Sequence, residues 1–138
     1  MSIRINEAFA IALADVAAGV FDGGELAIYD GARPASADVA ISTQTKLVDF
    51  TLGTPAFDPA VAVGAGGTAS ATDIAAVQAD ATQTATFFRM TSVDGTRTID
   101  GTVSDTSGAG DLKLSSTAVI AGIDVTVVSL TITMPKGA

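Results

Sequence analysis

Turn-forming residues divide most of this 138-residue sequence into short runs, and this punctuation is the strongest constraint on its fold. From Gly23 onward, runs with apolar residues at alternate positions are separated by glycine, proline and aspartate. Alternation with a period of two is typical of half-buried β-strands, and these breakers are typical of the turns between strands. The spacing predicts a mainly β fold, an antiparallel β-sandwich or jellyroll of about 7–9 strands over residues 24–134.

One segment near the N-terminus has helical character. Asn6 can cap a helix and good helix formers dominate the following residues, so we expect a short N-terminal helix over about residues 6–19, with Gly19 as its stop. Large apolar residues recur there at spacings of three and four: Phe9, Leu13, Val16 and Val20. This stripe indicates either a helix that covers an open end of the sheet, which we favour, or a helix that docks on a partner.

The length is sufficient for a single domain, residues 1–138, and too short for two of ordinary size. Small residues dominate, with 26 Ala, 14 Gly, 18 Thr and 10 Ser, so the apolar area available to a core is limited. This composition favours a protein that gains stability from copies of itself or from a partner surface.

The clearest local prediction is a hairpin around the Asp-Gly dipeptide at 94–95. If these residues form a two-residue loop, Arg89 faces Asp100 as an outer ion pair. On the inner side Phe88 faces Gly101, and an aromatic ring opposite a strand glycine shields bare backbone.

Three further segments carry weaker signals. Residues 64–72 are all small and are predicted to form a mobile surface loop, without the Gly-Lys-Ser/Thr of a phosphate-binding loop. Residues 73–81 fit a helical turn or a strand equally. The apolar phase shifts by one residue within 123–134, which predicts a β-bulge or burial on both faces of the last strand.

The chain has no His and no Cys. It therefore lacks the parts for Ser–His or Cys–His catalysis, zinc sites, haem and iron–sulfur ligation. The three lysines, Lys46, Lys113 and Lys136, lie in no Ser-x-x-Lys motif. We expect a protein that is not an enzyme, with no catalytic, cofactor-binding or metal-binding residues and no cofactor.

Pairs of carboxylates are the remaining candidates for chemistry. The closest in sequence are Asp22 with Glu25, Asp94 with Asp100, and Asp105 with Asp111. Each pair lies beside glycine in an expected turn, where aspartate is common for local reasons. Glycoside hydrolysis is disfavoured because the chain has no Trp and one Tyr for sugar stacking. Calcium in the aspartate-rich loops stays open, without an EF-hand spacing.

Fifteen acidic against seven basic residues give a net charge of −8. Such a chain is repelled by phosphate backbones, so we expect no nucleic-acid partner. The apolar run 8–20 is too short to span a membrane, and Asp15 interrupts it. We expect neither a membrane partner nor secretion.

The order of several segments suggests a family. After the Ala-rich helix come LAIYDGARP (26–34), TATFFRMTSVDGTRTIDGTVS (84–104), DLKLSS (111–116) and AGIDVTVVSLTI (121–132). In this order of turns and strands, over residues 8–132, the chain resembles the capsid cement, or decoration, proteins of tailed bacteriophages. No functional residue transfers, because that family has no catalytic motif.

The resemblance implies a jellyroll made in the host cytoplasm that binds the capsid exterior of the virion. Its partners would be the major capsid protein and itself, as a homodimer that bridges neighbouring subunits. If the helix packs on its own sheet, the contact with the capsid would come from loops such as 64–72 and from the chain ends. Two alternatives stay open: another virion component such as a tail-associated β-domain, and a calcium- or glycan-binding β-sandwich module.

Overall fold

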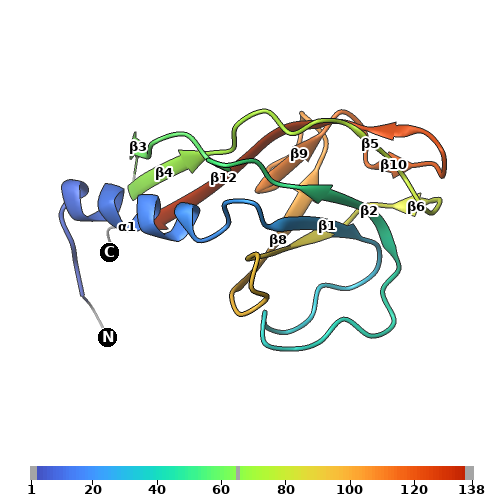
Figure 1. Ribbon diagram of the computed structural model, residues 1–138, viewed down its shortest axis with the longest axis horizontal. Coiled ribbons are helices and arrows are strands. Elements are labelled where there is room, and N and C mark those ends of the chain that lie inside the picture. The colour runs from blue at the N-terminus through green and yellow to red at the C-terminus, as the bar shows by residue number, and fades with distance from the viewer. Residues whose placement is uncertain (1–2, 65, 136–138) are drawn as a thin grey trace.

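The structure is a computed structural model that describes residues 3–64 and 66–135 (Figure 1). The fold is mainly β, with 41% strand and 10% helix, as the sequence predicted. The elements in chain order are α1 (Glu7–Gly19), β1 (Glu25–Tyr29), β2 (Lys46–Thr51), β3 (Val61–Val63), β4 (Gly66–Ser70), β5 (Val77–Gln78), β6 (Gln83–Thr84), β7 (Phe87–Thr91), β8 (Thr98–Ser104), β9 (Leu112–Leu114), β10 (Ala118–Val119), β11 (Asp124–Val125) and β12 (Val127–Pro135).

Eight strands form one sheet in the order β2-β1-β7-β8-β9-β12-β4-β3. Its neighbours pair antiparallel except β8 and β9, which are parallel, so the sheet is mixed rather than purely antiparallel. The parallel pair arises because the loop after β8 folds back on itself: Gly110 N–H donates to Ser104 Oγ (2.9 Å) before β9 begins.

Two small sheets, β10 with β6 and β11 with β5, bring the described residues to twelve strands. This exceeds the expected 7–9 because strands of two residues are too short to show an alternating pattern. Segment 73–81 contains the short strand β5 and no helix, and β6 follows it.

One hydrophobic core lies inside the β-sandwich. Side chains from β1, β2 and β7, such as Leu26, Phe50 and Met90, belong to the same buried cluster as Leu114 and Leu130 from β9 and β12. Because the two ends of the hydrogen-bonded series share a core, the sheet folds over on itself.

The helix begins as predicted: Asn6 Oδ1 accepts the N–H of Phe9 (2.9 Å). It ends at Gly19, but Val20 keeps a right-handed helical conformation, and the chain reverses only at Gly23, where φ is +70°. The predicted stop at Gly19 therefore marks the last helical residue and not the turn.

The helix packs on β4 and β12 mainly through its alanines, with Ile11 partly buried beside them. Ala10, Ala14 and Ala18 are buried, whereas the stripe that contains Phe9 faces outward. The helix does cover one end of the sheet (Figure 1), as we favoured, but with the opposite face.

The prediction of a mobile surface loop over residues 64–72 was wrong. Residues Gly66–Ser70 form strand β4, inside the sheet between β12 and β3, and the stretch from Gly66 to Ala69 is buried; residue 65 lies outside the described residues. Small side chains serve close packing here: a Cβ atom on Gly67 would come within 2.6 Å of the backbone of Ala10.

The predicted hairpin register is confirmed. Arg89 pairs with Asp100, and Phe88 pairs with Gly101. A Cβ atom on Gly101 would lie 2.5 Å from the Phe88 ring, so the ring does cover that backbone. The loop is longer than two residues, because the last cross-strand bond joins Ser92 N–H to Arg97 O (2.9 Å) and encloses four residues, Val93 to Thr96.

The ion pair of this hairpin is not an exposed one. The side chains of Arg89 and Asp100 are only 12% and 7% exposed. The long loop between β1 and β2 lies over this face of the sheet, where Thr98 Oγ1 donates to Ala37 O (3.2 Å). Tyr29 and Phe87 stack with ring centroids 5.2 Å apart.

The phase shift in the last strand is also confirmed. β11 and β12 are separate strands, and the register against β9 shifts between Val127 and Ser129. The shift leaves Val128 exposed and returns Leu130 and Ile132 to the core.

Candidate functional site

The aspartates of two turns have local structural roles. Asp94 Oδ1 accepts the Ser92 hydroxyl (2.7 Å), the Thr96 N–H (3.0 Å) and the Thr96 hydroxyl (2.8 Å). These three donors, the Ser92 hydroxyl first, lower the pKa of Asp94 to about 2. Asp105 accepts the hydroxyl and N–H of Ser107 in the same way, which lowers its pKa. Hydrogen bonding within each turn is a sufficient reason for an aspartate at these two positions, without a bound metal.

In each of the three carboxylate pairs proposed from the sequence, the two side chains have different hydrogen-bond or ion-pair partners. In the first, Asp22 accepts the Ala56 N–H while Glu25 lies by Lys46. In the second, Asp94 closes its turn while Asp100 binds Arg89.

The third pair behaves alike, since Asp105 holds Ser107 and Asp111 accepts from Thr102. Among residues 3–64 and 66–135, no group of three or more metal-ligating side chains occurs.

A charged cluster occupies the edge of the sheet at β2. Lys46 Nζ lies 3.0 Å from Asp49 Oδ2 and 3.9 Å from Glu25 Oε1. The pKa of Glu25 is raised, first by its hydrogen bond with Asp49 and then by partial burial. Charges on an edge strand oppose uncontrolled pairing with other sheets, so this cluster has a sufficient structural role.

The hollows of the surface are shallow and open. One, of about 370 Å³, lies between the second half of α1 and the loop 55–59. We call it the acidic hollow, because three of its lining residues are Asp15, Asp22 and Asp58 and none is basic. Its other lining residues are Ala18, Gly19, Pro55, Phe57 and Pro59, so the aspartates are its only polar side chains.

The most unusual feature of the surface is the outer face of α1. Phe9, Leu13 and Val16, which we call the helix patch, are 54%, 37% and 68% exposed. Leu13 lies one turn and Val16 two turns from Phe9, on the same side of the helix. Val20 continues the line and borders a hollow with Val93 at the tip of the β7–β8 hairpin.

A second apolar feature lies at the other end of the molecule. Ile120 and Ile123, which we call the turn patch, are 54% and 59% exposed. They belong to the turn between β10 and β11, closed by the Ile123 N–H to Ile120 O bond (3.0 Å). Figure 1 shows α1 at one end of the long axis and β10 and β5 at the other. The two patches are therefore well separated.

The sequence pattern identified the helix patch as an apolar stripe, but it was expected to face the sheet and is instead exposed. It missed the turn patch, although two isoleucines around Gly122, where turns are usually polar, were a usable signal. It also missed the acidic hollow, because Asp15, Asp22 and Asp58 come together only in the fold.

Comparisons with protein-family models, with curated proteins and with solved structures found no match. No helix in the described part of the chain is long and apolar enough to cross a membrane.

Proposed function

We propose that the chain is a structural virion protein that binds the outer surface of a phage head and cements neighbouring major capsid protein subunits. The observation that carries the proposal is the placement of two exposed apolar patches at opposite ends of the molecule. A protein with one such patch at each end can contact two subunits at once.

The energetics suit such a linker. Covering a half-exposed Phe, Leu, Ile or Val gains on the order of 1 kcal/mol each, so either patch alone binds weakly. Two weak contacts on one rigid body act together through effective concentration, and their combined binding stabilises the assembled particle by mass action.

Charge and the resemblance support the same role. A net charge of −8 suits a surface that faces away from packaged DNA. The order of turns and strands resembles that of cement proteins, which implies a homodimer as the bridging unit. A dimer would double the number of patches available to each bound unit.

The test is reconstitution. The purified protein is added to phage heads that lack it, and the occupancy and the temperature at which heads release DNA are measured. We expect saturable binding and a higher release temperature. A protein that leaves heads unbound and their release temperature unchanged refutes the proposal, and enrichment on isolated tails instead supports a tail-associated β-domain.

Variants locate the contact. Phe9→Ser with Val16→Ser removes most of the helix patch, and Ile120→Ser with Ile123→Ser removes the turn patch. Val39→Ser is the matched control, because Val39 is 47% exposed but lies in the loop between β1 and β2, outside both patches. Each patch variant should lower occupancy, whereas the control should bind like the parent protein. Equal binding of all three contradicts the two-ended linker.

A further inference from the structure

We propose that the helix patch and the acidic hollow together bind an amphipathic helical segment with a basic flank from a partner protein, and not a second copy of this chain. This inference rests on the proposed function, since it specifies the chemistry of the partner at one end of the linker.

The patch and the hollow are continuous on the surface. Gly19 lines the hollow and follows Val16 by three residues, so the two are neighbours on the helix. Glycine has no side chain to separate the apolar surface from the carboxylates. A single ligand can therefore place apolar groups on the helix patch and a cation in the hollow.

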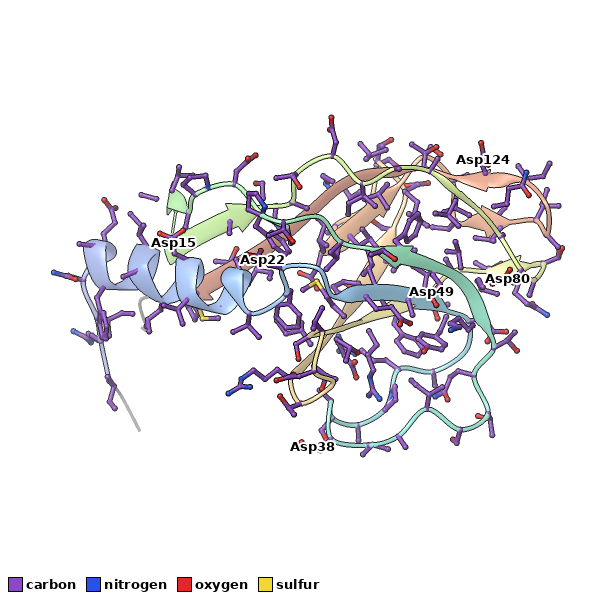
Figure 2. The ribbon with its side chains drawn as sticks, in the orientation of Figure 1. Asp15, Asp22, Asp38, Asp49, Asp80 and Asp124 are labelled. Carbon is purple, nitrogen blue, oxygen red and sulfur yellow. The ribbon has the colours of Figure 1, made fainter. Side chains whose placement is uncertain are left out.

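The hollow is arranged to receive positive charge. Asp15 Oδ1 accepts the N–H of Ala60 (2.7 Å) and Asp22 Oδ1 accepts the N–H of Ala56 (2.8 Å), which fixes both carboxylates. Their second oxygens bond to none of the described residues. Figure 2 shows Asp15 on α1 and Asp22 just beyond its end.

The end of the helix adds to this field. The C-terminal turn of α1 lines the hollow and contains no basic residue, so the negative end of the helix dipole is not offset within the helix. Lys or Arg from a partner would satisfy both the carboxylates and the dipole.

A second copy fits this surface poorly. If two α1 helices met antiparallel about a two-fold axis through their patches, the two acidic hollows would lie at opposite ends of the helix pair. The repulsion therefore comes from the net charge of −8 on each chain, which a partner segment with a basic flank does not carry. An anionic lipid surface is opposed by the same charges.

The spacing of the patch defines the ligand. Val16 follows Phe9 by seven positions, which is about 10 Å along the helix. A partner helix of two or more turns matches that length, with apolar residues on one face and Lys or Arg along one flank.

The experiment uses the full chain and two labelled helical peptides of about fourteen residues, one of Leu and Lys and one of Leu and Glu in the same pattern. Fluorescence anisotropy measures binding at two salt concentrations. We expect the Leu–Lys peptide to bind, and the Leu–Glu peptide to bind at least tenfold more weakly.

Two matched pairs of variants separate specific from general attraction. Asp58→Asn should weaken binding of the Leu–Lys peptide several-fold and reduce its salt dependence, whereas Asp38→Asn, an exposed aspartate far from α1 (Figure 2), should change it little. Phe9→Ser should weaken binding about tenfold and Val39→Ser should not. Equal effects within either pair overturn the inference, because binding would then reflect overall charge or overall hydrophobicity.

Sedimentation equilibrium tests whether a second copy of this chain binds the helix patch instead. Self-association of the parent chain at micromolar concentration that Phe9→Ser abolishes would assign the patch to a second copy and overturn the inference. Reconstitution separates this failure from that of the proposed function. Heads that bind a chain indifferent to the Leu–Lys peptide refute only the inference. A chain that binds the peptide as expected but leaves heads unbound refutes only the cement role.

Discussion

Gly67 of β4 lies so close to Ala10 of α1 that a Cβ atom on Gly67 would come within 2.6 Å of the Ala10 carbonyl. This contact determines which face of the helix packs inward. Only alanine-sized side chains fit between the helix and a strand at that distance, so Phe9, Leu13 and Val16 face outward, while Ile11 beside the contact is only partly buried. The exposure of the helix patch therefore follows from the close contact between Gly67 and Ala10 on the other face of α1.

Gly67→Ala should destabilise the fold by about 1–3 kcal/mol, because the added methyl group must push α1 away from β4. Urea unfolding followed by circular dichroism measures the change. Gly19→Ala is the control: nothing lies within 4 Å of a Cβ atom there, so it should be neutral or slightly stabilising in a helix. Equal stability of the two variants would contradict the close contact.

The shielded ion pair should matter more than the exposed one. Arg89 Nε and Nη2 donate to the two oxygens of Asp100 at 2.6 and 2.8 Å, and this hydrogen bond raises the pKa of Arg89. Asp100→Asn leaves the guanidinium poorly paired and should lower the free energy of unfolding by about 3–5 kcal/mol. Lys46→Gln, which breaks an exposed pair, should change it by about 1 kcal/mol or less.

A double variant completes this test. Replacing both members by apolar residues, Arg89→Met with Asp100→Leu, should recover much of the stability lost in Asp100→Asn, because no charge is left unpaired. If the single and double variants lose the same amount, the loss comes from packing and not from the unpaired charge.

The turn of the hairpin predicts an acidic titration. The folded pKa of Asp94, about 2, lies below its ordinary value of 3.8. The ionised carboxylate therefore stabilises the folded state at any pH above about 4, and this contribution is lost as the pH falls through about 2. A carbon-13 NMR titration of the carboxyl group measures the folded pKa directly.

Ser92→Ala should move that pKa upward the most, because the Ser92 hydroxyl is the largest cause of its depression. Thr96→Val removes only a hydroxyl and keeps the backbone N–H, so its effect should be smaller. An Asp94 pKa near 4 in the parent protein would show that the turn bonds do not persist in solution.

The sequence allowed the fold to be predicted where local chemistry decides the structure. The cap at Asn6, the strand containing Leu26 and Ile28, the hairpin register and the bulge near Val127 depend on neighbours along the chain or across one turn. Such features follow from periodicity and turn residues.

It failed where distant segments decide. The stretch around Gly67 has the composition of a loop, and only the approach of α1 makes it a buried strand. The close contact between α1 and β4 also leaves the apolar stripe exposed. An apolar helix face is expected to be buried, but here the alanine face of α1 packs more closely on the sheet. The acidic hollow joins residues from α1 and the loop 55–59, which no local pattern connects.

Removal of metal should leave the protein unchanged. The aspartates that could have suggested calcium accept bonds from Ser92, Thr96 and Ser107 within their own turns. We expect the same melting temperature with and without a chelator, and no rise on addition of millimolar calcium. A clear loss of stability on chelation would support the calcium-binding alternative.

The orientation of α1 is tested by exchanging side-chain size on its two faces. Val16→Ser changes a side chain that is 68% exposed, so the free energy of unfolding should move by about 0.5 kcal/mol or less. Ala14→Leu puts extra volume at a position with no exposed surface and should cost about 1–3 kcal/mol. By sequence pattern alone the reverse is expected, since valine in an apolar stripe should be buried and alanine tolerant. Retained stability in Val16→Ser, with loss in Ala14→Leu, would also mean that the apolar residues of the helix patch do little for the fold and are available to a partner. The opposite ranking would return the stripe to the core and remove the surface on which the docking proposal depends.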